Sequence, residues 1–142
     1  MIILEKGAFE ELPEEIKEEI KGRRKLIRDL EPYDVSEPIL DECIDFDLIS
    51  PDKKRIGRER YKCTFSRKDI YIIITCCALW EMGIEKSERD QLLKGCSLKD
   101  VKEVQRKIKD SSYLQFLDFL KNKKVVLERR EGLRKFLTFK LP

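Results

Sequence analysis

The chain has 142 residues, of which 31 are Lys or Arg and 28 are Asp or Glu, and it contains no histidine. This length predicts one domain with a core that needs neither disulfides nor a metal. The lack of histidine excludes a Ser-His-Asp or Cys-His catalytic site and any zinc site that uses imidazole. The sequence has no run of 18 or more apolar residues and no signal-peptide pattern, so we expect a soluble, cytoplasmic protein that does not contact membranes.

The first third of the chain predicts two helices. Pro13, followed by two glutamates, marks a helix start, and apolar residues at helical spacing continue this helix across Gly22 to Pro32. Ser36 is a good N-cap for a shorter helix with Pro38 in its first turn. The buried side of this second helix is expected to comprise Ile39, Leu40, Cys43, Ile44 and Leu48.

The middle of the chain predicts a basic loop, a strand and a long helix. Residues 51–62 form the loop around Gly57, and residues 61–65 alternate and are rich in β-forming side chains. Ser66 and Asp69 then have the spacing of a capping box, which predicts the start of a helix that ends at Gly83.

The last third predicts three more helices and a β-hairpin. A short helix over residues 86–94 ends at Gly95, and a second capping-box pattern begins at Ser97. Its helix presents Leu98, Val101, Val104 and Ile108 on one face. Another helix opens at Ser111 or Ser112 and presents Leu114, Phe116, Leu117 and Leu120. Alternating apolar residues over 124–141 fit a hairpin around Gly132.

The cysteines do not have the spacing of a metal site. The five are Cys43, Cys63, Cys76, Cys77 and Cys96. No C-x-x-C pair occurs, so we expect small buried side chains in a reducing compartment, with no metal and no cofactor. A redox- or metal-sensing role of Cys76, Cys77 or Cys96 is the alternative.

The small net charge of +3 hides a strong segregation of charge along the chain. Residues 31–50 carry seven acidic and no basic side chains, whereas residues 51–68 carry eight basic and two acidic ones. Blocks of this size indicate either complementarity within or between chains, or a basic surface that binds a polyanion.

Five short motifs occur in order over residues 26–95. They are Val35-Ser36-Glu-Pro-Ile-Leu40, Leu48-Ile49-Ser50-Pro51, Arg58-Glu-Arg60-Tyr61, Phe65-Ser66-Arg-Lys-Asp69-Ile70 and Leu79-Trp-Glu-Met82-Gly83-Ile84. This succession resembles the DNA-binding half of the MerR family of bacterial transcriptional regulators. The resemblance implies a mainly α fold with small β elements, in which a winged helix-turn-helix is followed by helices and a C-terminal β-hairpin.

The resemblance also implies a domain organisation and a function. Residues 1–25 would be an N-terminal helical extension, 26–95 the winged-helix domain, and 96–142 a part for dimerisation or partner binding. The protein would be a homodimeric regulator that contacts the phosphates of duplex DNA through a basic wing. The candidate DNA-binding residues are Lys53, Lys54, Arg55, Arg58, Arg60, Tyr61, Arg67 and Lys68.

The recognition helix departs from the family pattern. Where the family usually has Arg and Tyr residues, this chain has Asp41 and Glu42, and Coulomb repulsion from DNA phosphates opposes docking of such a helix in the major groove. An alternative is therefore a protein-interaction adaptor on a winged-helix frame that does not bind DNA. Its partner-binding residues would be Asp41, Glu42, Ile44 and Phe46.

Two further classes of protein fit less well. The segment from Arg24 to Asp52 also resembles the first helices of a caspase-recruitment domain of the death fold, which would be an all-helical adaptor. An enzyme is not expected, because no pattern places two carboxylates beside a nucleophile or a metal, and we assign no catalytic residues.

Overall fold

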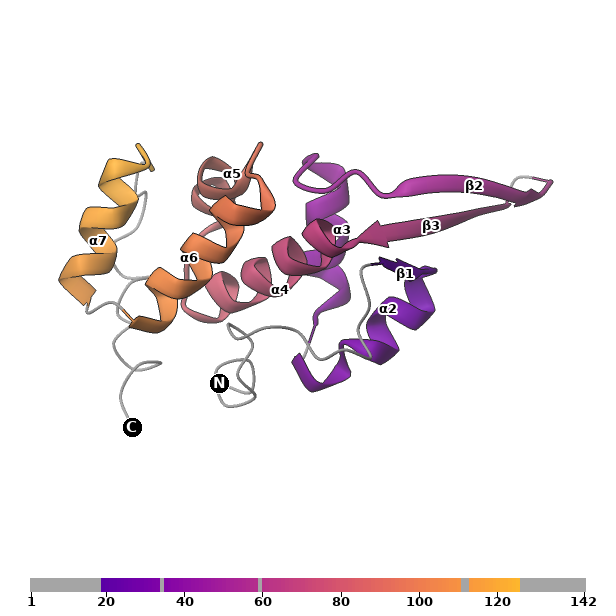
Figure 1. Cartoon of the computed structure of the whole chain (residues 1–142), viewed down its shortest axis with the longest axis horizontal. Coiled ribbons are helices and arrows are strands. Elements are labelled where there is room, and N and C mark those ends of the chain that lie inside the picture. Colours follow the sequence, from indigo (N-terminus) through magenta and orange to yellow (C-terminus); the bar gives the residue numbers. More distant parts are fainter. Residues whose placement is uncertain (1–18, 34, 59, 111–112, 126–142) are drawn as a thin grey trace.

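The computed structural model describes residues 19–33, 35–58, 60–110 and 113–125 (Figure 1). In chain order these residues form β1 (Glu19–Lys21), α2 (Arg23–Asp29), the short 3-10 helix η1 (Glu31–Tyr33), α3 (Glu37–Asp45), β2 (Asp52–Gly57), β3 (Arg60–Ser66), α4 (Arg67–Glu81), α5 (Lys86–Leu93), α6 (Leu98–Asp110) and α7 (Tyr113–Asn122). The expectation of a mainly helical fold with small β elements is confirmed. Across the described residues, none of the helices has the length and apolarity needed to span a membrane.

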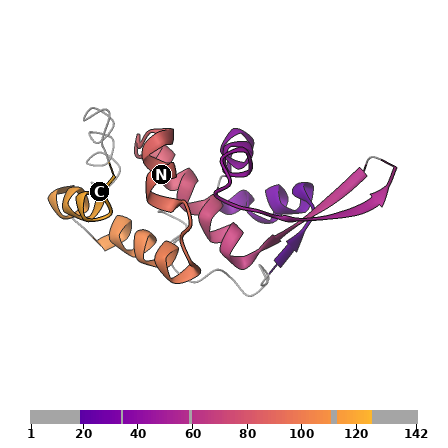
Figure 2. The same cartoon turned by 90° about the horizontal axis from the view of Figure 1, so that it is seen from above.

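The strands form one antiparallel sheet in the order β1-β3-β2. Ile20 of β1 lies opposite Phe65 of β3, and both side chains are buried, which fixes the base of the sheet against the helices. The β2–β3 hairpin then extends well away from the helical body (Figures 1 and 2). The predicted strand over residues 61–65 is confirmed, but residues 52–57 pair with it as β2 and are not a loop. This sheet also makes the all-helical alternative wrong.

The prediction of one continuous helix up to Pro32 is wrong for the residues of this segment that the structure describes. Residues 19–21 are the strand β1, and α2 begins only at Arg23. Gly22 separates them with a φ of 95°, a conformation that side-chain-bearing residues rarely adopt, and its N–H donates to the Cys63 carbonyl at 2.7 Å. Pairing with β3 therefore overrides the helical spacing of Ile20. The predicted helix start at Pro13 lies outside the described residues.

Helix α4 is the centre of the molecule, and α3, α5, α6 and the sheet surround it (Figures 1 and 2). Every side chain from residue 69 to residue 79 is buried. The polar groups among them are satisfied: the Thr75 hydroxyl donates to the Tyr71 carbonyl at 2.7 Å, and the Gln105 amide of α6 donates to Thr75 Oγ1 at 2.9 Å. A helix buried on all sides is typical of a core element.

The flanking helices confirm most of the predicted buried faces. In α3, Ile39, Leu40 and Cys43 are buried, whereas Ile44 and Leu48 are half-buried and pack against the core. In α6, Val101, Val104 and Ile108 are buried, and Leu98 packs beside them.

Helix α7 differs from the prediction at one position. Phe116 and Leu120 are buried as expected, but Leu114 is 70% exposed. Leu114 precedes Phe116 by two residues and therefore lies on a different face of the helix, because residues three or four apart share a face. Ser111, Ser112, the Leu117 side chain and the predicted hairpin from residue 126 onward lie outside the described structure.

The start of α4 offers a test of the capping box. The Ser66 hydroxyl accepts the Asp69 N–H at 3.2 Å, and the Asp69 carboxylate accepts the Ser66 N–H at 3.0 Å. Ser36 is the N-cap of α3 but its side chain makes no capping hydrogen bond. We expect Ser66→Ala to lower the free energy of unfolding by about 1 kcal/mol and Ser36→Ala by less than half of that, as measured by urea denaturation. Equal losses in the two variants would show that the box does not set the start of α4.

Candidate nucleic-acid interface

The β2–β3 hairpin carries an exposed group of cations. Lys53, Lys54, Arg55 and Arg58 all have exposed side chains. None of these four forms an ion pair with another described residue, and Arg55 donates to the Gly57 carbonyl at 3.3 Å. Their charges are therefore not neutralised within the described part of the molecule.

The strand register places two lysines at opposed backbone positions. Lys54 of β2 lies directly opposite Lys62 of β3. A pair of basic residues at opposed positions does not favour strand pairing. The hairpin thus carries a concentration of basic residues that strand pairing does not require.

The other predicted DNA-binding residues are placed differently. Arg60 and Tyr61 belong to β3, but their side chains lie outside the described structure. Arg67 lies in the first turn of α4, with its guanidinium 5.6 Å from the Tyr71 ring centroid. Lys68 lines a polar depression that it shares with Glu19, Asp47, Asp52 and Asp69, where carboxylates outnumber it. The structure therefore brings together the cations of β2 and the turn, but not all eight predicted residues.

Helix α3 carries the acidic side chains, and the first of these pairs with α2. Arg23 Nη1 donates to Asp41 Oδ1 at 2.7 Å, and its other terminal nitrogen lies 4.0 Å from a Glu37 oxygen. The hydrogen bond with Asp41 raises the pKa of Arg23. Because both partners are well exposed, this pair contributes little to stability.

A second pair joins α3 to α5. Arg89 Nη2 contacts Glu42 Oε2 at 2.5 Å, and Arg89 Nη1 donates to the Ile84 carbonyl at 2.7 Å. The Arg89 side chain is only 5% exposed and that of Glu42 is 34% exposed. Glu42 therefore balances a buried guanidinium, which gives this acid a structural role.

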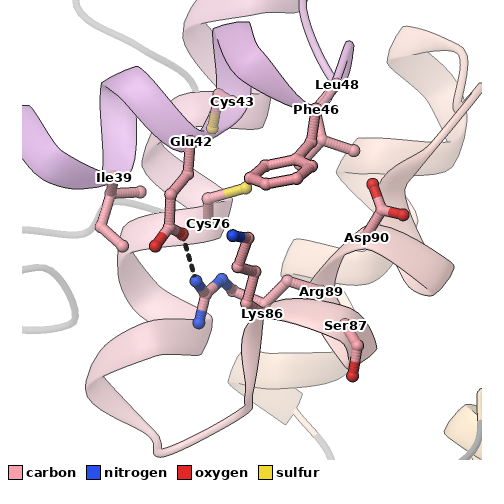
Figure 3. Close-up of a pocket in the computed structure, with 10 residues that line it drawn as sticks. All are labelled: Ile39, Glu42, Cys43, Phe46, Leu48, Cys76, Lys86, Ser87, Arg89 and Asp90. Atoms are coloured by element: carbon pink, nitrogen blue, oxygen red, sulfur yellow. Dashed lines mark hydrogen bonds and ion pairs between the residues drawn. The ribbon is translucent and has the colours of Figure 1, made fainter.

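The two apolar residues of the predicted partner-binding set lie differently. Ile44 is half-buried and packs against the core, whereas Phe46 is 39% exposed. The Lys86 ammonium of α5 lies 3.7 Å from the centroid of the Phe46 ring, in cation–π contact (Figure 3).

Sequence reasoning missed the three cations that face α3: Arg23, Lys86 and Arg89. Arg23 and Asp41 are 18 residues apart, and Glu42 and Arg89 are 47 residues apart. Neither spacing matches a helical or hairpin contact, so no local pattern could reveal these pairs.

The prediction of small buried cysteine side chains is confirmed for three of the five. Cys43, Cys76 and Cys77 are buried, whereas Cys63 and Cys96 are half-buried. A hydrogen bond with the Cys43 thiol and burial raise the pKa of Cys76, and burial raises the pKa of Cys77 to about 12. Within the described ranges, no group of three or more Cys, Asp or Glu residues is arranged to hold a metal ion.

Comparisons of the chain with protein-family models, curated proteins and solved structures found no significant match.

The two ion pairs of α3 predict unequal effects of two similar substitutions. We expect Glu42→Gln to lower the free energy of unfolding by about 2 kcal/mol, because it leaves the Arg89 charge buried without its carboxylate; the partial exposure of Glu42 keeps the loss below the ~3–5 kcal/mol of a fully buried pair. Asp41→Asn removes an exposed pair and is expected to cost under about 1 kcal/mol. Urea denaturation measures both, and a larger loss for Asp41→Asn would contradict this ranking.

The thiols predict a pattern of alkylation and a pH dependence. At pH 8 we expect iodoacetamide to modify the half-buried Cys63 and Cys96 of the native protein well before the buried Cys76 and Cys77, because the thiolate is the nucleophile. Burial raises the pKa of Cys96 as well, but the pKa values of Cys76 and Cys77 are raised further. Above about pH 9 the unfolded chain ionises at Cys77 but the native protein does not, so stability falls as pH rises towards 12. Peptide mass spectrometry follows the labelling, and Cys77→Ala should flatten the alkaline fall.

Proposed function

We propose that this protein binds duplex DNA through the β2–β3 hairpin, and that it acts as a homodimeric transcriptional regulator of MerR-like winged-helix type. The observation that carries the proposal is the protruding hairpin with four exposed cations, none of which is ion-paired within the described residues. Lysine and arginine side chains in this setting contact phosphate oxygens, arginine through its planar fork.

The order of elements supports this proposal. Helices α2 and α3 follow each other across the short η1, and the hairpin comes next before α4 (Figure 1). In a helix-turn-helix the second helix takes the recognition position, which here corresponds to α3, and a hairpin that follows corresponds to the wing.

The ion pairs of α3 lower the electrostatic obstacle to DNA binding. One uncompensated carboxylate about 4 Å from a phosphate costs ~1 kcal/mol in water and ~4 kcal/mol at an effective dielectric of 20. Arg23 neutralises the charge of Asp41, and Arg89 neutralises the charge of Glu42. A phosphate near α3 would therefore meet two neutral ion pairs at these positions and not two free negative charges. Glu37 and Asp45 remain exposed, and we therefore expect binding that is dominated by backbone contacts, strongly salt-dependent and weakly sequence-selective.

The alternative function is a protein-interaction adaptor that uses α3. The exposed Phe46 and the exposed acids Glu37 and Asp45 support it, because a basic partner with an apolar pocket fits such a surface. Its support is weaker, since Asp41 and Glu42 already bind cations of their own chain.

The DNA-binding proposal predicts a specific effect of reversing hairpin charges. We expect Lys54→Glu combined with Arg58→Glu to weaken binding of a fluorescein-labelled duplex about equally for unrelated sequences. The slope of log affinity against log salt should become shallower by ~0.9 for each phosphate that the variant no longer neutralises. Fluorescence anisotropy over a series of salt concentrations measures both effects.

The matched control places the same charge change elsewhere. Arg106 and Lys107 are exposed residues of α6, and helix α6 lies away from the hairpin in both views (Figures 1 and 2). Arg106→Glu combined with Lys107→Glu changes the net charge equally and should leave most of the affinity intact. Equal losses in the two double variants would refute the assignment to the hairpin, and failure of the unmodified protein to bind any duplex at low salt would refute DNA binding. Capture of a protein that Glu37→Lys and Asp45→Lys release would favour the adaptor.

A further inference from the structure

The acidic segment that precedes β1 is complementary in charge to the basic hairpin. Residues 1–18, which lie outside the described structure, carry six glutamates and two lysines. The hairpin carries four exposed cations that form no ion pair within the described residues: Lys53, Lys54, Arg55 and Arg58. Blocks of opposite charge on one chain favour contact between them.

The acidic segment enters the sheet at the base of the hairpin. It leads directly into Glu19 of β1, which lies opposite Ser66 of β3. Lys54 of β2 lies opposite Lys62, four residues nearer the tip of the hairpin. At ~3.4 Å per residue and ~4.8 Å between neighbouring strands, Lys54 is roughly 17 Å from Glu19.

The segment is long enough to bring its carboxylates to the hairpin cations. A chain extends by at most ~3.6 Å per residue, so a residue five to nine positions before Glu19 reaches ~18–32 Å from it. Three glutamates have this reach: Glu10, Glu11 and Glu14. The attachment of the segment at β1 therefore permits contact with Lys54 and its neighbours.

Helix α2 also carries exposed cations near β1, but the hairpin attracts a negative segment more strongly. The exposed Lys25 of α2 has Asp29 four residues further along the same helix, a spacing at which opposite charges are neighbours. Residues 53–58 of the hairpin contain no acid, and residues 61–63, which lie opposite them, contain none either. The hairpin cations thus lack the acidic neighbour that Lys25 has.

We propose that the acidic segment of residues 1–18 binds the β2–β3 hairpin of its own chain and competes there with DNA phosphates. Glutamate carboxylates then occupy the places around the lysine and arginine side chains that phosphate oxygens would take. Covalent attachment beside the hairpin gives an effective concentration on the order of millimolar, so that ion pairs that are individually weak act together. The competition rests on the proposed function, whereas the contact does not.

Zero-length cross-linking tests the contact without DNA. A carbodiimide joins a carboxylate to a lysine amine where the two are in direct contact. We expect peptide mass spectrometry to find links from the glutamates of residues 10–14 to Lys53 or Lys54. Protein labelled with ¹⁴N and ¹⁵N is refolded as an equal mixture, so that a link between two chains would combine both isotopes. No such link, links to Lys25 alone, or links only between chains would overturn the proposal.

Two double variants with the same charge change test the competition. Glu10→Gln with Glu11→Gln removes two charges from the segment. Asp110→Asn with Asp118→Asn removes two exposed charges from α6 and α7, which lie away from the hairpin (Figure 1). We expect the segment variant to bind a labelled duplex about threefold more tightly at low salt, because more of its hairpins are open to DNA. The control should gain less than half as much.

The outcomes separate the competition from DNA binding itself. Equal gains in the two double variants, or no gain in the segment variant, would overturn the competition while DNA binding stands. Failure of the unmodified protein and of both variants to bind any duplex would refute DNA binding and the competition together. The cross-links within one chain decide the contact in either case.

Discussion

The burial of α4 on all its sides is the constraint on which the other elements depend. Eleven consecutive residues, 69–79, are buried, so the sheet, α3, α5 and α6 must all pack around this helix to keep its apolar surface from water. Helix α4 begins at Arg67 directly after β3 ends at Ser66, and the capping box of Ser66 and Asp69 fixes that junction. The basic hairpin therefore projects from a base that the core itself holds in place.

Two groups of charged residues, on α3 and on the hairpin, differ in their partners. The acids of α3 at positions 41 and 42 bind arginines from α2 and α5, which links three helices around the core. The cations of β2 and its turn have no such partners among the described residues, and Lys54 even lies opposite Lys62. Two acids of α3 are thus ion-paired with arginines of neighbouring helices, whereas the four exposed cations of β2 and its turn have no ion pair within the described residues. This asymmetry is what makes the hairpin the better-supported site for a polyanion.

Features set by neighbouring residues could be predicted, and those set by distant ones could not. Both capping boxes, at Ser66 and at Ser97, form as the four-residue patterns indicate. Strand β1 was missed because Ile20 gains its partner Phe65 from 45 positions along the chain, and β2 because a run of lysine and arginine has low β-propensity until β3 pairs with it. The arginines that face α3 likewise reach it only through tertiary packing.

Helix α3, the candidate recognition helix, is joined to α5 by the ion pair of Glu42 and Arg89. Both residues also line a pocket of about 230 Å³ between the two helices, so the packing of α3 against α5 determines the surroundings of this pair. Because Glu42 also neutralises Arg89, a shift of α3 away from α5 would expose an acid and leave a buried cation unpaired. The packing of α3 against α5 is therefore also the arrangement in which the Glu42 charge is compensated and in which α3 would repel a phosphate backbone least.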